Sequence, residues 1–185
     1  MVNFVCPWWL GYLLASPIRR PVQDPAKILA PYVHEGMTVL EPGPGMGFFT
    51  LELARLVGPS GRVVAVDLQP RMLAGLKRRA ARAGLGERVD ARLAERDSLG
   101  VPDLAGKVDF ALAFALVHEL PAAGPFFTQV AETLKPGACL LLAEPTGHVN
   151  AAEFEDELQA AAQAGLQLVD RPTIRRSRTA LLKRV

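Results

Sequence analysis

The run Glu41-Pro42-Gly43-Pro44-Gly45-Met46-Gly47 places an acidic residue and three alternating glycines directly after a short apolar segment. We expect a strand over 37–41, a turn through the glycines and a helix over 49–56. Glycines at such a turn let the backbone adopt positive φ and let a ligand approach without meeting a Cβ. The first N–H groups of the following helix would favour a polar or anionic group. The pattern therefore predicts a ligand site at this turn.

The spacing of the glycines separates two kinds of cofactor. A dinucleotide fingerprint, G-x-G-x-x-G, would need glycine at position 48, where the chain has Phe48. A second acid, Asp67, ends the next predicted strand over 62–67, and ligands of alternating α/β folds lie outside the carboxyl ends of such strands. A carboxylate there can accept the hydroxyl protons of a ribose, and Leu68 offers an apolar surface to a flat base. The paired acids favour a ribose-bearing cofactor over ordinary loop acids beside a tight turn.

These motifs resemble those of class I S-adenosylmethionine-dependent methyltransferases, over about residues 27–185. Within that family the chain is most similar to small single-domain enzymes whose core resembles the ubiquinone/menaquinone-biosynthesis methyltransferases. The resemblance implies S-adenosylmethionine as cofactor. It places Glu95 and Arg96 against the adenine, although the family more often has aspartate at the first position, and Phe114 at the strand end beside the reacting methyl group. The cofactor-binding residues so implied are Glu41, Gly43, Gly45, Gly47, Asp67, Leu68, Glu95, Arg96 and Phe114.

Alternating patterns along the rest of the chain predict a parallel sheet with helices between its strands. Further strands are expected over 89–93, 108–114 and 138–144, and further helices over 71–83, 125–134 and 151–164. The last two strands, over 166–171 and 178–183, have no helix between them and should pair antiparallel. The expected fold is α/β, a Rossmann-like doubly wound sheet, mostly parallel and closed by a C-terminal antiparallel hairpin. We expect an apolar N-terminal segment over 1–26 and one cofactor-binding domain over 27–185.

Charge and residue composition limit the kinds of partner that we expect for this protein. The net charge of +2 is too small to indicate nucleic acid. Basic residues on the predicted helix over 71–83, Arg79 among them, should form a solvated face, with Met72 and Leu76 turned inward. No pattern of histidines, cysteines or carboxylates indicates a metal. The N-terminal segment lacks the start and cleavage site of a signal peptide, and it is too short and broken for a membrane span. We expect a cytoplasmic enzyme, and the oligomeric state is open.

Methyl transfer from a sulfonium needs chiefly alignment of the acceptor and exclusion of water. A base is needed only where the acceptor carries its proton near neutral pH. His118, a few residues beyond the strand over 108–114, is the candidate base; the alternative is a turn residue satisfied by Glu119 or the backbone. Glu119 and His148 are candidate substrate contacts. For His148 the alternative is entry to the helix that Asn150 would cap.

The aromatic residues Trp8, Trp9 and Tyr12 lie outside the core motifs and are the remaining candidates for substrate contact. The segment that carries them could fold back as a lid over a water-excluded pocket. A dimer contact, an anchor at a membrane surface and packing against the sheet are the alternatives. The sequence thus predicts an enzyme that transfers a methyl group to a small-molecule acceptor. An RNA or protein methyltransferase and a noncatalytic cofactor-binding module are the competing interpretations.

Overall fold

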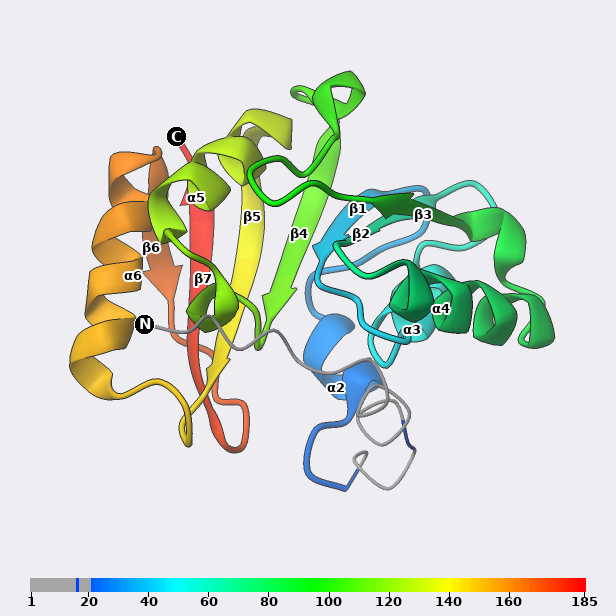
Figure 1. The fold of residues 1–185 in the computed structure, drawn as a ribbon, viewed down its shortest axis with the longest axis horizontal. Helices are drawn as coiled ribbons and strands as arrows, with labels where there is room; N and C mark the ends of the chain where they lie inside the picture. The colour runs from blue at the N-terminus through cyan, green and yellow to red at the C-terminus, as the bar shows by residue number, and fades with distance from the viewer. Residues whose placement is uncertain (1–15, 17–20) are drawn as a thin grey trace. The chain divides into compact units, whose positions relative to one another are not determined.

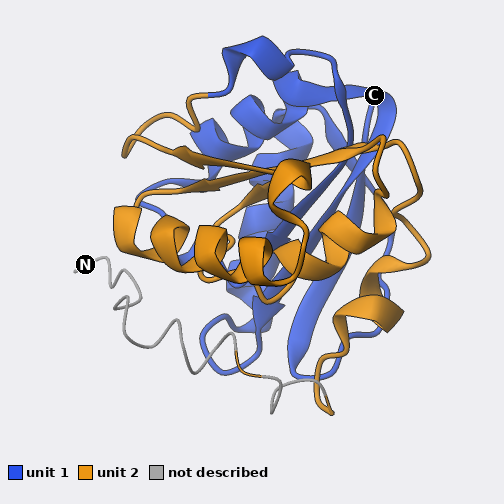
Figure 2. Ribbon diagram, turned by 90° about the vertical axis from the view of Figure 1, so that its right-hand side faces the viewer, with its two compact units in different colours: residues 1–5, 101–185 blue, residues 6–100 orange. Residues whose placement is uncertain are grey.

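The computed structural model describes Ser16 and residues 21–185, and Figure 1 shows its fold. The described chain forms two compact units, one of Ser16 and residues 21–100 and the other of residues 101–185 (Figure 2). Trp8, Trp9 and Tyr12 lie outside the described residues. Within the part of the chain that is described, no helix combines the length and the apolar run that crossing a membrane requires.

The unit of residues 21–100 carries three parallel strands with helices between them. Its elements are α2 (Pro25–Leu29), β1 (Thr38–Pro42), α3 (Thr50–Leu56), β2 (Arg62–Asp67), α4 (Pro70–Arg82), a 3-10 turn (Gly86–Arg88) and β3 (Val89–Leu93). β1 and β2 are buried at almost every position, as strands covered on both faces require. Glu41 pairs with Ala65, and Asp67 pairs with Leu93. Because the strands are parallel, both acids lie at the carboxyl edge of this part of the sheet.

The unit of residues 101–185 combines two parallel strands with an antiparallel pair. Its elements are two 3-10 turns (Pro102–Leu104 and Val117–Glu119), β4 (Val108–Phe114), α5 (Ala123–Thr133), β5 (Leu134–Pro145), α6 (Ala151–Gln163), β6 (Leu166–Asp170) and β7 (Ser177–Arg184). β5 runs parallel to β4, whereas β7 runs antiparallel to both β5 and β6. Phe114 pairs with Ala143, so β4 and β5 end at the same edge. α5 contacts α6, and α6 also contacts β6 (Figure 1).

The strand order of the seven-stranded sheet is β3-β2-β1-β4-β5-β7-β6. This confirms the predicted fold class, a mostly parallel α/β sheet closed by an antiparallel pair. The predicted boundaries agree to within a few residues except at β5, which begins at Leu134. The register shifts between Val108 and Phe110 of β4, so Pro136-Gly137, expected as a turn before the strand, lie in a bulged stretch of β5. The short helix α2, capped by Asp24, was not predicted.

Candidate active site

The glycine turn lies between β1 and α3. Gly43, Gly45 and Gly47 have φ of 68°, 54° and 84°, a left-handed region that glycine adopts without strain. The Gly43 N–H donates to the Val66 carbonyl oxygen at 2.8 Å, which ties the turn to β2. A Cβ at Gly47 would lie 2.4 Å from Leu76 Cδ1, whereas a Cβ at Gly45 would meet no atom of the described residues within 4 Å. Gly47 is therefore required by packing, and Gly45 leaves open space beside the backbone.

The helix after the turn begins at Thr50, later than predicted, and has only seven residues. Residues 45–49 form turns, and the Gly47 N–H donates to the Pro44 carbonyl oxygen at 2.9 Å. A helix this short has a small dipole, and its start is separated from the last glycine. The helix start differs from the predicted one by one residue. That its N-terminus receives a polar or anionic group stays a prediction.

Asp67 holds the glycine turn from the end of β2. Its residue is 9% exposed, and its Oδ2 accepts the Gly45 N–H at 3.2 Å while its Oδ1 accepts the Gln69 N–H at 2.8 Å. A carboxylate oxygen has two lone pairs and can accept more than one hydrogen bond. The two bonds fix the carboxylate in place beside the turn.

Glu41 is 4% exposed at the end of β1. Burial raises its pKa to about 8; the Thr50 hydroxyl opposes this rise and the Asp67 carboxylate adds to it. Among the described residues its Oε2 has no hydrogen-bond partner. A buried oxygen without a partner, next to a turn with open space at Gly45, fits a polar cofactor group. The residues present therefore fit S-adenosylmethionine, whose amino and hydroxyl groups are donors.

The other implied cofactor residues of this unit follow β2 and β3. Leu68 is 39% exposed, so it can offer an apolar surface. Glu95 and Arg96 are exposed in the loop after β3. The Ala94 N–H donates to the Asp67 carbonyl oxygen at 3.0 Å, which brings the start of that loop beside Asp67. The Glu95 N–H donates to the Ser98 carbonyl oxygen at 2.9 Å and closes a turn.

His118 and Glu144 form the central pair of the unit of residues 101–185. β4 ends at the half-buried Phe114, and Ala115 follows with φ of 54°, an uncommon conformation for a residue with a Cβ. Glu144, fully buried near the end of β5, accepts the N–H groups of Leu116 and Val117 on Oε1 at 3.0 and 2.9 Å. Its Oε2 pairs with Nδ1 of His118. One carboxylate therefore fixes both the turn that carries His118 and the ring itself.

This pairing sets the chemistry of His118. The hydrogen bond to Glu144 raises the pKa of the imidazole above its usual 6.5, and burial opposes the rise. With the proton on Nδ1 directed at Glu144, the neutral ring presents Nε2 as a proton acceptor. The side chain is 18% exposed, so this nitrogen is only partly shielded from solvent. A histidine oriented by a buried carboxylate is the arrangement that general bases use.

Glu144 was missed by the sequence reasoning, which considered Glu119 as the partner of His118. The Glu119 carboxylate contributes to the raised pKa of His118, but the bond is made by Glu144. The sequence carried a signal for Glu144, because the predicted strand over 138–144 ends at this residue, one position before the end of β5. The same criterion, an acid at the carboxyl end of a strand, had singled out Glu41 and Asp67.

His148 and Glu157 complete this group of side chains. His148 is exposed in the turn after β5, with its ring centroid 5.3 Å from that of His118. The predicted cap of α6 is confirmed, since Asn150 accepts the N–H groups of Ala152 and Glu153. Glu157 is 9% exposed on α6, and its Oε2 lacks a hydrogen-bond partner among the described residues. Burial raises its pKa to about 8, the Glu144 charge adds to the rise, and His118 opposes it.

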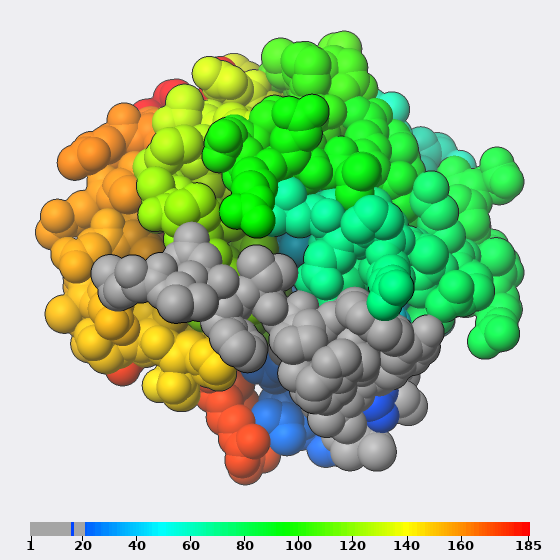
Figure 3. All heavy atoms as spheres, in the orientation of Figure 1, coloured from blue at the N-terminus to red at the C-terminus, as the bar shows by residue number. Residues whose placement is uncertain are grey.

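One basic residue departs from the predicted solvated face of α4. Arg71, Lys77, Arg78 and Arg82 are exposed, and residues of α4 reach the surface in the space-filling view (Figure 3). Arg79 is half-buried, and its Nη1 donates to the Met46 carbonyl oxygen in the glycine turn. Its residue type led to its grouping with the exposed basic residues, whereas its spacing from Met72 and Leu76 puts it on the packed face, from which its long side chain reaches the glycine turn.

The sequence profile of a family described as "Methyltransferase domain" matches residues 33–176. The chain belongs to this family. It is 32% identical over 124 residues to the Arsenite methyltransferase of Halobacterium salinarum, covering 67% of this chain and 30% of that protein. It is 30% identical over 112 residues to the Ubiquinone/menaquinone biosynthesis C-methyltransferase UbiE of Hahella chejuensis, covering 60% and 44%. Against the Ribosomal protein L11 methyltransferase of Pelotomaculum thermopropionicum, identity is 33% over 118 residues, covering 62% and 34%. The matched part thus spans less than half of each of these relatives.

A solved structure matches along the whole chain. The crystal structure of a SAM dependent methyltransferase from Aquifex aeolicus superposes with a TM-score of 0.87 and 25% sequence identity, covering 98% of this chain and 100% of that one. The protein is therefore a class I methyltransferase that depends on S-adenosylmethionine. Its relatives act on acceptors of different kinds, so the family alone leaves the acceptor open.

Proposed function

We propose that this methyltransferase methylates a small-molecule acceptor and that His118, oriented by Glu144, is its general base. The observation that carries the proposal is the bonding of one buried Glu144 carboxylate to the His118 ring and to two backbone amides of its turn. Such a pair has a use when the acceptor carries a proton that must leave, as a hydroxyl or an amine does. A bound S-adenosylmethionine supplies an activated methyl group on a sulfonium, which transfers by in-line displacement.

Residues of the unit that spans 21–100 would bind the cofactor. Asp67, a carboxylate fixed at the end of β2 by the Gly45 and Gln69 N–H groups, would accept ribose hydroxyls. Glu41 offers a buried oxygen to a donor group of the cofactor, and the space at Gly45 admits the cofactor close to the backbone. Leu68, Glu95 and Arg96 are assigned to the adenine by the resemblance, and Phe114 to the neighbourhood of the reacting methyl group.

The residues around His118 would bind and activate the acceptor. Nε2 takes the acceptor's proton, and the resulting imidazolium is stabilised by the Glu144 carboxylate that holds Nδ1. Glu119 and His148, which lie close to His118 in sequence or in space, would contact the acceptor. The partly shielded ring suits an acceptor atom that can enter a confined position. The lid role of Trp8, Trp9 and Tyr12, and a cytoplasmic location, stay predictions.

A protein and an RNA are the two alternative classes of acceptor. Relatives named for ribosomal protein L11 and for protein L-isoaspartate favour a protein acceptor as the second candidate. An RNA acceptor would need basic side chains that reach phosphates, and residues 171–184 are rich in arginine, but several of these side chains bind within the chain. Arg171 pairs with Glu155 at 2.8 Å, Arg178 donates to the Val149 carbonyl oxygen at 3.0 Å, and Arg184 donates to that of Leu134. Side chains engaged within the chain are less available to phosphates.

Calorimetric titration with S-adenosylmethionine and S-adenosylhomocysteine tests the cofactor residues. Asp67→Ala should weaken binding of both by about 10- to 100-fold, the range expected for lost bonds to a charged group. Glu87→Ala, which removes an exposed acid elsewhere in the same unit, should bind as the wild type does. Equal affinities in all three proteins would contradict the assignment of Asp67.

The acceptor class is tested by transfer of a labelled methyl group to a metabolite extract, to a protein fraction and to RNA, each assayed separately. We expect label in the metabolite extract, and the amount should fall in His118→Ala while cofactor affinity is kept. Label found only in the protein fraction would replace a small molecule with a protein acceptor. A loss of cofactor binding in His118→Ala would show that the residue is structural.

A further inference from the structure

Helix α4 packs one face against the glycine turn. Met72, Gly75, Leu76 and Arg79 follow the i, i+3, i+4, i+7 spacing of a single helix face. The Met46 side chain packs against Met72, and a Cβ at Gly75 would lie 3.0 Å from Met46 Cγ and Sδ. At the next position Leu76 fills the space that a Cβ at Gly47 would need. The shape of the turn is thus matched to this face of α4.

The turn is held at three points by groups outside it. The Gly43 N–H bonds to the Val66 carbonyl oxygen, and the Gly45 N–H bonds to the Asp67 carboxylate. The third point is the Met46 carbonyl oxygen, which accepts from Arg79 Nη1 and lies before the first residue of α3. The first two bonds come from β2 and its end, whereas the third comes from α4. Arg79 therefore fixes the peptide between Gly45 and Gly47 from the opposite end of the turn.

The Arg79 bond is of a strong kind. A guanidinium donates charge-assisted hydrogen bonds, which are worth about twice as much as neutral ones. Burial lowers the pKa of Arg79, as expected for a cation removed partly from water, and arginine stays protonated at neutral pH. A half-buried cation directed at one backbone carbonyl in a glycine-rich turn restricts conformations that glycine would otherwise allow.

We propose that Arg79 is a positioning residue, which holds the Met46 peptide so that the glycine turn keeps the conformation that binds the cofactor. The inference rests on the proposed role of Glu41 to Gly47 and Asp67 in cofactor binding. In this role Arg79 acts through the Met46 peptide, to which its guanidinium donates. Its removal should let residues 45–47 sample other conformations, and cofactor binding would then select the competent one at a cost in affinity.

The test measures S-adenosylhomocysteine affinity in the full-length wild type, Arg79→Met, Arg79→Lys and Arg82→Met. Arg82 is exposed in the last turn of the same helix, so Arg82→Met controls for loss of one positive charge from α4. We expect Arg79→Met to raise Kd by about 10- to 100-fold, which is the effect of losing a charged hydrogen bond. Arg79→Lys keeps a cationic donor and should recover part of this loss. Arg82→Met should stay within about twofold of the wild type.

Steady-state kinetics and thermal unfolding distinguish positioning from a purely structural role. Positioning predicts that KM for S-adenosylmethionine rises by the same factor as Kd, with a smaller change in kcat. If Arg79→Met lowers Tm but binds S-adenosylhomocysteine as tightly as the wild type at a temperature where it is folded, the inference is overturned. If Arg79→Met does not fold, Arg79→Lys decides: wild-type affinity together with a lowered Tm overturns the inference, and weakened affinity at an unchanged Tm supports it. Failure of the proposed cofactor site would look different, because Asp67→Ala would then bind as the wild type does.

Discussion

Glu157, the buried acid on α6, offers a direct test of the electrostatics in the unit of residues 101–185. In the folded protein burial raises the pKa of Glu157 from the ordinary 4.5 to about 8. The folded state therefore holds this proton more tightly than the unfolded state. The contribution of Glu157 to stability is fully present below pH 4.5, and it is lost as pH rises through about 8. At 1.36 kcal/mol per pKa unit, the complete titration amounts to about 5 kcal/mol.

Glu157→Gln removes this titration while keeping the size of the side chain. Between about pH 5 and about pH 9, the variant should gain about 4 kcal/mol in free energy of unfolding relative to the wild type. Urea unfolding followed by far-UV circular dichroism measures this difference, provided that the two proteins have the same m-value. The gain should be largest at alkaline pH, where the wild type carries a buried charge.

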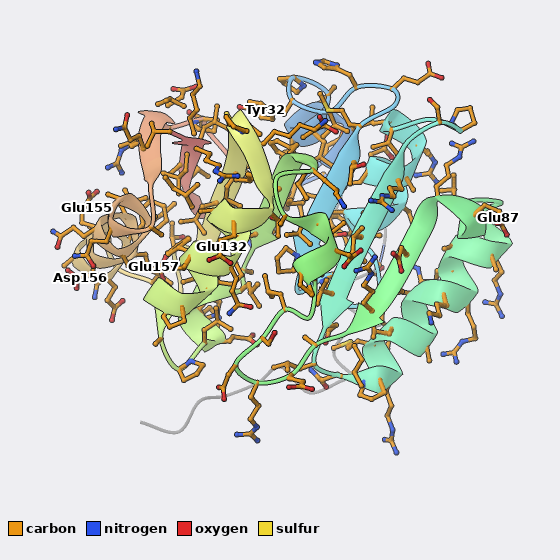
Figure 4. All side chains as sticks on the ribbon, turned by 90° about the horizontal axis from the view of Figure 1, so that it is seen from above. Tyr32, Glu87, Glu132, Glu155, Asp156 and Glu157 are labelled. Carbon is orange, nitrogen blue, oxygen red and sulfur yellow. The ribbon has the colours of Figure 1, made fainter. Side chains whose placement is uncertain are left out.

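Asp156→Asn is the matched control. Asp156 and Glu155 neighbour Glu157 on α6, and Figure 4 labels all three acids. Asp156 is exposed, so its neutralisation should change the free energy of unfolding by less than about 0.5 kcal/mol across the same pH range. Parallel curves for Glu157→Gln and the wild type from pH 5 to pH 9 would refute the reasoning, since they would mean that burial does not hold the proton on Glu157.

Four further predictions concern catalysis, the glycine turn and the N-terminal segment. His118→Ala should lower kcat by about 100- to 10,000-fold if the acceptor must lose a proton. In a pH–rate profile of the wild type, kcat/KM should decrease as pH falls below the pKa of His118, which lies above 6.5. Glu144→Gln should shift this decrease to lower pH, because it removes the hydrogen bond that raises the pKa. Gly47→Ala should destabilise the fold by about 1–3 kcal/mol, because its Cβ would lie 2.4 Å from Leu76 Cδ1 at a φ of 84°. A Cβ at Gly45 has room but stands at a φ of 54°, so Gly45→Ala should destabilise the fold less than Gly47→Ala does and weaken S-adenosylhomocysteine binding more. The reverse order of effects in thermal unfolding and calorimetry would contradict the assignment of open space to the cofactor. A chain that begins at Asp24 should keep cofactor affinity and lose turnover if the N-terminal segment is a lid, and unchanged turnover of the folded truncation would exclude the lid.

Hydrophobic periodicity and the residues typical of turns were enough to predict the sheet. Buried parallel strands such as β2 are almost continuous apolar runs, and the absence of a helix between β6 and β7 indicated their antiparallel pairing. The bulge in β5 was not predictable, because Pro136-Gly137 is a turn signal in sequence and only the pairing of Val108 with Leu134 draws it into the strand. Local preferences do not contain such long-range pairing.

The candidate site likewise has residues that the sequence revealed and contacts that it did not. Glu41, the glycines and Asp67 are close in sequence or follow a rule for strand ends, so spacing revealed them. Glu144 lies 26 residues from His118, and Arg79 lies 33 residues from Met46. Their contacts depend on side-chain direction after the strands and helices have packed. A one-dimensional pattern does not supply that direction.

The double role of Glu144 limits how this enzyme can change. The carboxylate that orients His118 also accepts the Leu116 and Val117 N–H groups, next to a residue with positive φ at Ala115. Replacement of His118 alone would leave a buried carboxylate with an unfilled bond, and replacement of Glu144 would release the turn together with the ring. A substitution at either position therefore disturbs contacts of the other, and we expect the two residues to vary together.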